Sequence, residues 1–366
     1  MYKTIRPLLF KLYPEDIHAL SLDALNNTRY FFGAQWLLKK IYAAPPKPVE
    51  AFGLTFPNPV GLAAGFDKNA AAVRSLSLLG FGHIEVGTVT PLKQRGNPEP
   101  RVFRLPEDEA IINRMGFPSH GAVRVTKSLK KLGYCRYASP AAERVINLRR
   151  FFPEGRHKRK NKSMILGVNI GKNKSTPNEE AVLDYLALLE NFAPCADYLT
   201  INISSPNTEG LRDLQARNAL EKLLKELDFQ RKMEEEKLEK RVPLLVKLSP
   251  DLSEAALDDA LEVILATDMD GIIATNTTLS RPAGLGSAHR DETGGLSGSP
   301  LRDASEAALR QIVQRVNGKI PVVSSGGIMN PDDAKRRLDM GATLIQIYTG
   351  LVYEGPGLVK KIVKAL

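Results

Sequence analysis

The sequence predicts an α/β protein whose main body is a closed (β/α)8 barrel of the TIM type, preceded by an amphipathic helical extension. Short apolar segments rich in β-branched residues recur eight times, at intervals that leave room for a helix between them. Polar or glycine residues follow each segment at its carboxyl end. A doubly wound open sheet shows the same alternation, but eight units with polar ends favour the closed barrel.

The predicted strands cover residues 59–65, 83–89, 164–171, 198–204, 243–248, 271–275, 321–325 and 344–348. Helix starts are recognisable between them at Pro177, Ser253 and Pro331, and acidic residues follow each start. Strands that alternate with helices pair in parallel through right-handed crossovers. We therefore expect the barrel to occupy residues 49–366.

Residues 1–48 lie outside this repeat. Apolar clusters at residues 8–12 and 30–38, interleaved with lysine and arginine, predict two short amphipathic helices, and a proline-rich linker follows at residues 45–48. Two interpretations stay open for these helices: a cap over the bottom of the barrel, or an extension that lies on a membrane surface. No segment approaches the roughly 20 apolar residues that a membrane span needs.

The formal net charge of +10 comes from one part of the chain. Residues 122–163 hold 13 lysines and arginines against two glutamates, so the remainder is close to neutral. Most of this charge belongs to a basic insertion around residues 134–163, between the second and third strands. A confined basic segment favours a solvated loop or a contact with acidic lipid, and we expect no nucleic-acid partner.

The chain has two cysteines, Cys135 and Cys195. Two are too few for a disulfide framework, and their spacing is not that of metal ligands. We therefore expect reduced thiols in a reducing compartment.

The polar residues that follow the predicted strands define one candidate site, because the carboxyl ends of barrel strands meet on a common face. They are mostly amides, hydroxyls and lysines, namely Lys68, Thr88, Asn169, Asn202, Ser205, Asn207, Lys247, Thr275, Asn276, Thr277, Tyr348 and Thr349. Acidic residues and histidines are almost absent from this set. Neither a metal site nor a carboxylate pair for glycoside hydrolysis is therefore expected.

Three glycines near the last two strand ends, Gly298, Gly327 and Gly350, predict a site for a phosphate-bearing cofactor, since backbone N–H groups approach an anion where no side chain intervenes. Lys247, within a buried strand, needs a negative partner. It suits either a Schiff base, as in barrel aldolases, or a reduced flavin ring. The spacing of the residues does not decide between these two.

Taken together, the motifs resemble the dihydroorotate dehydrogenases, and within them the quinone-linked, membrane-associated class 2. The resemblance runs from about Tyr2 to the C-terminus. It rests on these motifs, all in order: G-L-A-A-G-F-D-K, E-V-G-T-V-T-P, R-V-F-R-L, I-N-R-M-G-F, G-V-N-I-G-K-N-K, I-N-I-S-S-P-N-T, A-T-N-T-T-L, T-G-G-L-S-G and Q-I-Y-T-G. The basic insertion makes the connection between I-N-R-M-G-F and G-V-N-I-G-K-N-K longer than in the simpler bacterial class 2 pattern.

The resemblance implies a role for individual residues. Ser205 matches the catalytic base, where class 1 relatives carry cysteine. Contacts with FMN are implied for Ala64, Gly65, Thr88, Asn169, Asn202, Lys247, Thr275, Gly298, Gly327, Tyr348 and Thr349. Contacts with orotate are implied for Lys68, Asn113, Arg114, Met115, Gly116, Phe117, Asn202, Asn207, Asn276 and Thr277. A path for quinone is implied beside Arg104 and Tyr348.

The implied reaction is the oxidation of (S)-dihydroorotate to orotate in de novo pyrimidine (UMP) biosynthesis. FMN would accept the hydride, and a membrane quinone would be the terminal electron acceptor. The N-terminal helices would form a lipid-facing entrance, on a peripheral protein of the cytoplasmic face of the inner membrane. The alternatives are a class 1 enzyme linked to fumarate or NAD, a Schiff-base aldolase using Lys247, and a module that binds nucleic acid or lipid.

Overall fold

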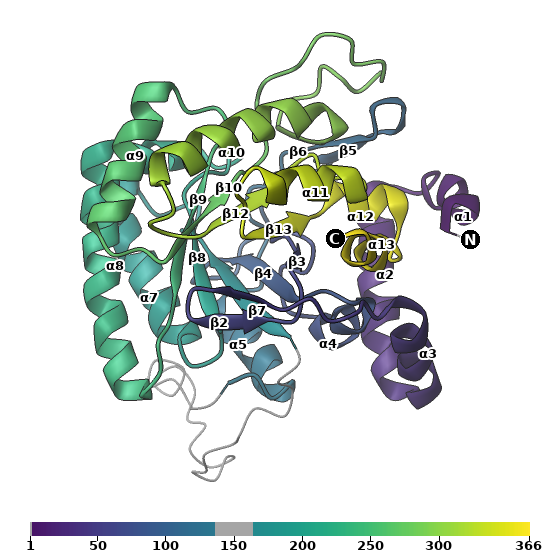
Figure 1. Cartoon of the computed structure of the whole chain (residues 1–366), viewed down its shortest axis with the longest axis horizontal. Coiled ribbons are helices and arrows are strands. Elements are labelled where there is room, and N and C mark those ends of the chain that lie inside the picture. The colour runs from purple at the N-terminus through teal and green to yellow at the C-terminus, as the bar shows by residue number, and fades with distance from the viewer. Residues whose placement is uncertain (1, 136–163) are drawn as a thin grey trace.

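A computed structural model describes residues 2–135 and 164–366, so the predicted basic insertion lies outside the described residues except at its two ends. Eight parallel strands close into a barrel in the order β10-β12-β13-β3-β4-β7-β8-β9 (Figure 1). Each lies within a predicted strand, which confirms the (β/α)8 fold. They are β3 (Val60–Leu62), β4 (His83–Val89), β7 (Ile165–Ile170), β8 (Tyr198–Asn202), β9 (Leu244–Leu248), β10 (Gly271–Ala274), β12 (Val322–Ser325) and β13 (Leu344–Ile347).

Helices surround this barrel and bury the outer faces of its strands, as a parallel sheet requires. They are α4 (Val73–Leu76), α5 (Ala122–Lys131), α7 (Ala181–Phe192), α8 (Arg217–Leu238), α9 (Glu254–Ala266), α10 (Arg302–Val316), α11 (Pro331–Asp339), α12 (Thr349–Glu354) and α13 (Leu358–Ala365). The predicted starts of α9 and α11 are confirmed. Ser253 and Asn330 cap them by accepting the backbone N–H groups of Ala256 and Asp333.

A short antiparallel hairpin closes the amino end of the barrel. It consists of β1 (Val49–Ala51) and β2 (Leu54–Phe56). The ring of Phe56 lies 5.3 Å from that of His83, and the ring of Phe52 lies 6.3 Å from that of Tyr198. His83 and Tyr198 are the first residues of β4 and β8, so the hairpin fills the floor with aromatic side chains.

The opposite, carboxyl end carries a three-stranded antiparallel sheet that the sequence did not predict. It pairs β5 (Val102–Leu105), β6 (Ala110–Asn113) and β11 (Gly295–Gly298), with β6 in the centre. Strands from two distant parts of the chain meet here, and such pairing is not visible in local periodicity. The sheet forms a wall over the strand ends.

The N-terminal extension forms three helices rather than the two predicted. They are α1 (Tyr2–Leu9), α2 (Pro14–Asn27) and α3 (Phe32–Tyr42), and they lie together on one side of the barrel beside α4, α12 and α13 (Figure 1). The hydroxyl of Tyr2 donates to the backbone oxygen of Val352 over 2.6 Å, and Arg6 donates to that of Tyr353 over 2.9 Å. Helix α1 therefore packs beside α12 at the carboxyl end, whereas α3 packs beside residues 77–79, just before β4. The extension lies along the side of the barrel and its floor is closed by the β1–β2 hairpin, so the interpretation as a bottom cap was wrong.

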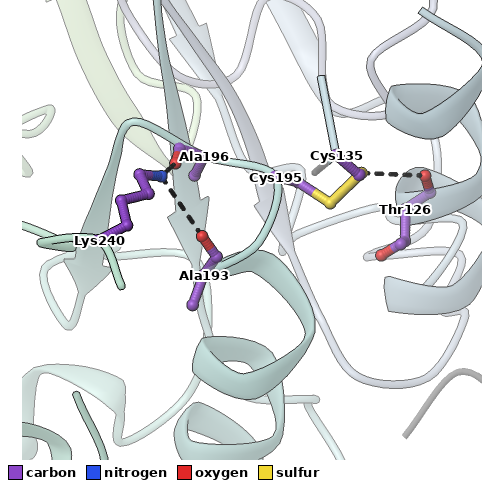
Figure 2. The surroundings of a disulfide bond; sticks show 6 residues. All are labelled: Thr126, Cys135, Ala193, Cys195, Ala196 and Lys240. Atoms are coloured by element: carbon purple, nitrogen blue, oxygen red, sulfur yellow. Dashed lines mark hydrogen bonds between the residues drawn. A yellow bond between two sulfur atoms is a disulfide. The ribbon is translucent and has the colours of Figure 1, made fainter. Parts of the chain in front are cut away.

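The expectation of reduced thiols was also wrong, because Cys135 and Cys195 form a disulfide (Figure 2). Cys135 is the last described residue after α5, and Cys195 lies in the turn between α7 and β8. Lys240 donates to the backbone oxygen of Ala196 in the same turn. The two cysteines are 60 residues apart, and only the packing of α5 against α7 brings them together.

Candidate active site

One cavity of about 1570 Å³ opens at the carboxyl ends of the barrel strands and reaches the N-terminal helices. It gathers nearly all of the predicted site residues. Those that line it are Ala64, Gly65, Lys68, Thr88, Arg104, Asn113, Met115, Gly116, Phe117, Asn202, Ser205, Asn207, Lys247, Thr275, Asn276, Thr277, Gly298, Gly327, Tyr348 and Thr349.

Asn169 and Arg114 are the two exceptions. Asn169 is fully buried below the cavity, where it accepts hydrogen bonds from Thr88 Oγ1 over 2.5 Å and from Asn202 Nδ2 over 3.0 Å. The side chain of Arg114 turns away, donates to Glu292 over 2.6 Å and lies 4.5 Å from the ring centre of Phe103. The structure does not bring the guanidinium of Arg114 to the cavity.

Ser205 lies in the loop that follows β8, where Pro206 prevents the strand from continuing. Its side chain is almost buried, and its hydroxyl oxygen accepts the backbone N–H of Asn207 over 3.3 Å. The Oγ proton of Ser205 remains available for another partner.

Amide side chains surround this loop. Asn207 Nδ2 donates to Asn113 Oδ1 over 3.2 Å, and Asn276 Nδ2 donates to Ser204 Oγ over 3.0 Å. These groups come from β6 and from the loops after β8 and β10. Amides offer both donors and acceptors, which suits a ligand with alternating N–H and C=O groups along its edge.

Two lysines supply positive charge at the cavity. Lys68 donates to the backbone oxygen of Gly65 over 2.6 Å, and burial lowers its pKa to about 8. Lys247 projects from β9, and its ammonium group makes no hydrogen bond within the described part of the chain. Burial lowers the pKa of Lys247, while the carboxylate of Glu85 opposes that shift. Both lysines suit a ligand that is or becomes negative.

The loop after β12 has the features of an anion cradle. The buried backbone N–H groups of Gly327 and Ile328 have no hydrogen-bond acceptor among the described residues, although buried N–H groups are nearly always paired. A Cβ atom at Gly327 would lie 2.4 Å from Arg302 Cα, so only glycine fits. Thr349 and Gly350 begin α12 beside this loop. The arrangement fits a phosphate group.

The far side of the cavity is built by the N-terminal helices. Arg104 on β5 donates to the backbone oxygens of Leu9 and Leu12, and its guanidinium lies 4.6 Å from the ring centre of Phe10. The ring of Tyr348 lies 5.7 Å from that of Phe66, and burial raises the pKa of Tyr348 to about 12. Arg104 and Tyr348 therefore face the part of the cavity nearest the extension.

Sequence reasoning missed Glu15, His18, Glu85 and Gln346. Glu15 and His18 line the cavity from α2, a helix that was not predicted. Glu85 is a carboxylate within an apolar strand, and that position is itself a signal, because a charge is buried only where partners satisfy it.

Within residues 2–135 and 164–366, no group of three or more histidine, cysteine or acidic side chains is placed to hold a metal ion. None of the helices described is long and apolar enough to cross a bilayer.

Residues 48–366 match the model of the dihydroorotate dehydrogenase family. The chain is 46% identical to the dihydroorotate dehydrogenase (quinone) of Idiomarina loihiensis, over the whole of both chains. It is 45% identical to the enzyme of the same name from Stutzerimonas stutzeri, covering all of this chain and 98% of the relative. A crystal structure of the Eimeria tenella enzyme in complex with ferulenol superposes with a TM-score of 0.80 at 37% identity, covering 98% of this chain and 93% of that one. The chain therefore belongs to the dihydroorotate dehydrogenase family, in its quinone-dependent class.

Proposed function

We propose that this chain oxidises (S)-dihydroorotate to orotate in de novo pyrimidine (UMP) biosynthesis, with FMN taking the hydride and a membrane quinone as terminal electron acceptor. One observation carries the proposal: the hydroxyl of Ser205, several amides, Lys247 and the glycine loop after β12 all line a single cavity. Family membership supports the same reaction. It also makes the aldolase and fumarate- or NAD-linked alternatives unnecessary.

The residues present fit FMN. The N–H groups of Gly327 and Ile328, without acceptors in the described residues, suit its phosphate. Gln346 Oε1 is buried without a partner among the described residues and belongs to a cavity-lining side chain, so it suits a ring N–H. Lys247 would offset negative charge on the ring. When bound, the flavin supplies a two-electron acceptor, which none of the side chains that line the cavity provides.

Dihydroorotate would lie between the flavin and Ser205, held by the amides of Asn113, Asn207 and Asn276. Ser205 would take a proton from one ring carbon while hydride leaves the adjacent carbon. Since a serine hydroxyl is a weak base in water, the surrounding donors must be fixed in place and solvent must be excluded. The near-complete burial of Ser205 supports this requirement.

The proton taken by Ser205 needs an onward path. Thr208 lies three residues beyond Ser205, and its Oγ1 is buried with no hydrogen-bond partner among the described residues. A buried water between these hydroxyls would satisfy that oxygen and carry the proton outward.

The quinone would reach the cavity between the N-terminal helices. Ten of the sixteen large apolar side chains exposed in the described residues lie between Ile5 and Ile41, and they suit a lipid surface. Arg104 and Tyr348 would line the path. The protein would then be peripheral to the membrane, on its cytoplasmic face.

Spectroscopy tests the reaction in two steps. Purified protein should be yellow, dihydroorotate should bleach the flavin without oxygen, and a soluble quinone should restore the colour. Ser205→Ala should keep the flavin and bind orotate but lose two or more orders of magnitude in the bleaching rate, in line with about 10²–10⁴-fold for general-base catalysis. Ser280→Ala, at an exposed position outside the lining of the cavity, is the matched control. A colourless protein, or unchanged bleaching by Ser205→Ala, would contradict the proposal.

A further inference from the structure

The carboxylate of Glu85 on β4 lies inside the barrel below the cavity and is fully buried. Four neutral side chains donate to it. Asn169 Nδ2 reaches Oε1 over 2.8 Å, while three donors reach Oε2: Gln346 Nε2 over 2.8 Å, Thr200 Oγ1 over 3.1 Å and the Tyr198 hydroxyl over 3.2 Å. Glu85 does not itself line the cavity.

An ionised carboxylate only accepts hydrogen bonds. Glu85 therefore requires Asn169 to present its NH₂ group downward, which leaves Asn169 Oδ1 facing upward. That oxygen accepts from Thr88 Oγ1 over 2.5 Å and from Asn202 Nδ2 over 3.0 Å. The orientation of one amide thus sets the orientation of the next.

The same logic continues to the substrate side of the cavity. Asn202 uses its NH₂ group on Asn169 and on Thr88 Oγ1, the latter over 2.9 Å, so Asn202 Oδ1 points the other way. It accepts from Ser204 Oγ over 3.2 Å and from Asn276 Nδ2 over 3.3 Å. Every link donates toward Glu85, from the loops beside Ser205 down to the barrel interior.

We propose that Glu85 is a positioning residue that fixes the donor and acceptor direction of the amides of Asn202 and Asn276 at the substrate site. An amide has nearly the same shape in either orientation, so packing alone does not choose between them. The carboxylate of Glu85, which only accepts hydrogen bonds, selects one orientation. This inference rests on the proposed function, because it assigns these two amides to the pyrimidine.

The charge on Glu85 has a partner of opposite sign. The carboxylate favours the charged form of Lys247, against the effect of burial. Glu85 therefore has a second link to the site, through a lysine that lines the cavity and is the direct register partner of Asn202 in the β8–β9 pairing.

Exchanging the carboxylate of Glu85 and the amide of Asn169 tests the inference. The exchange preserves shape, because glutamine matches glutamate and aspartate matches asparagine. In Asn169→Asp a carboxylate oxygen faces Glu85, so the lower link becomes repulsive. In the double variant Glu85→Gln/Asn169→Asp, the new glutamine donates upward to the new aspartate. That aspartate still accepts from Thr88 and Asn202, so the direction of the upper chain returns.

Orotate affinity, measured by titration of the flavin-loaded proteins at about pH 8, is the first readout. We expect Asn169→Asp to weaken binding on the order of tenfold or more, and the double variant to recover most of the loss. Thr200→Val is the matched control. It removes a donor to Glu85 but leaves Asn169 in place, so affinity should stay within about twofold of the wild type.

Thermal unfolding of the same proteins without orotate is the second readout. If Asn169→Asp fails to fold and the double variant folds, the recovery itself supports the coupling. Unchanged orotate affinity in Asn169→Asp, or no recovery of affinity or folding in the double variant, would overturn the inference. A wild-type protein that binds no orotate would instead contradict the proposed function. The hydrogen-bond chain would still be tested in that case, by whether the double variant recovers the unfolding temperature that Asn169→Asp loses.

Discussion

The carboxylate of Glu15 on α2 accepts a paired set of hydrogen bonds from the guanidinium of Arg101, with Nε 2.9 Å from Oε2 and Nη2 2.9 Å from Oε1. Arg101 also donates to the backbone oxygens of Arg95 and Asn97. Asn97 in turn donates to the backbone oxygen of Asn207, two residues beyond Ser205. A continuous set of contacts thus joins the N-terminal extension to the loop that carries Ser205.

Replacing Glu15 by glutamine should loosen this junction. The Arg101 side chain is only 10% exposed, so loss of its charged partner should cost about 1–3 kcal/mol of the free energy that docks the extension. Limited proteolysis within residues 2–42 should become faster. Lys3→Gln is the control, because Lys3 pairs with Glu354 at the surface, is 64% exposed, and should change docking by less than about 1 kcal/mol. Equal resistance to proteolysis in the Glu15 and Lys3 variants would count against a structural role for the Glu15–Arg101 pair.

Arg337 should matter for the phosphate of the cofactor without touching it. This arginine is fully buried and donates over 3.1 Å to the backbone oxygens of both Arg302 and Gly326, beside the anion cradle. Lysine has a single nitrogen, so Arg337→Lys cannot keep these two bonds, both made by Nη2, together with the contact of Nε with Glu306 over 3.3 Å. We expect FMN affinity to fall about tenfold or more, with a much smaller change for riboflavin, which lacks the phosphate.

The control for that measurement is Arg336→Lys, at a neighbouring side chain that is 46% exposed. Flavin fluorescence titration measures both affinities. Equal losses for FMN and riboflavin would mean that Arg337 supports the barrel in general and not the phosphate loop.

Orotate binding should weaken as the pH rises through the pKa of Lys68. Burial lowers this pKa to about 8, so the ammonium loses its proton above that pH and no longer attracts an anion. We expect the dissociation constant to rise between about pH 7 and 9. Lys68→Arg stays charged in this range and should flatten the profile. A wild-type profile that is itself flat would show that Lys68 does not sense the ligand's charge.

Docking of the extension should weaken in acid because of His18. Burial, followed by the charge of Lys68, lowers the pKa of His18 from 6.5 to about 4, while its ring nitrogen is 2.8 Å from the backbone oxygen of Phe66. The undocked state therefore binds protons more readily, and stability is lost as the pH falls from about 6.5 to 4, by about 3 kcal/mol in all.

Hydrogen exchange of α2 across this range measures the effect. His18→Gln should remove most of the pH dependence, whereas His120→Gln, at an exposed histidine of the barrel, should leave it in place. The same slope in the His18 variant would assign the acid sensitivity to another group.

The exposed aromatic side chains of α3 should hold the protein on lipid. Phe32 is 87% exposed and Trp36 is 55% exposed. Helix α3, which carries both, lies on the side of the molecule opposite α8 (Figure 1). Phe32→Ser/Trp36→Ser should reduce binding to phospholipid vesicles about tenfold or more, while turnover with a water-soluble quinone stays the same. Phe229→Ser, on α8 and 65% exposed, is the control. Unchanged vesicle binding in the double variant, or an equal loss in the control, would contradict a lipid contact of α3.

Local patterns were sufficient for the barrel and for most of the cavity wall. Strands buried on both faces carry continuous apolar runs, and their carboxyl ends converge whatever the details of packing, so residues such as Ser205 and Lys247 could be placed on one face from sequence. Contacts between distant segments could not be predicted in this way. The sheet of β5, β6 and β11 and the Cys135–Cys195 disulfide both join parts of the chain far apart in sequence.

Two further features escaped because their signals are weak in a single sequence. Helix α2 mixes histidine, serine and aspartate with its apolar residues, so its amphipathic pattern did not stand out. Glu85 lies within the motif E-V-G-T-V-T-P, and period-two alternation does not reveal which face of a barrel strand points inward.

The aromatic hairpin formed by β1 and β2 plugs the barrel from below, with Phe56 completely enclosed. The barrel is thus closed at its amino end, and the cavity opens at the carboxyl ends of its strands. In the proposed function, dihydroorotate and quinone would therefore both enter from the side of the strand ends that carries Ser205.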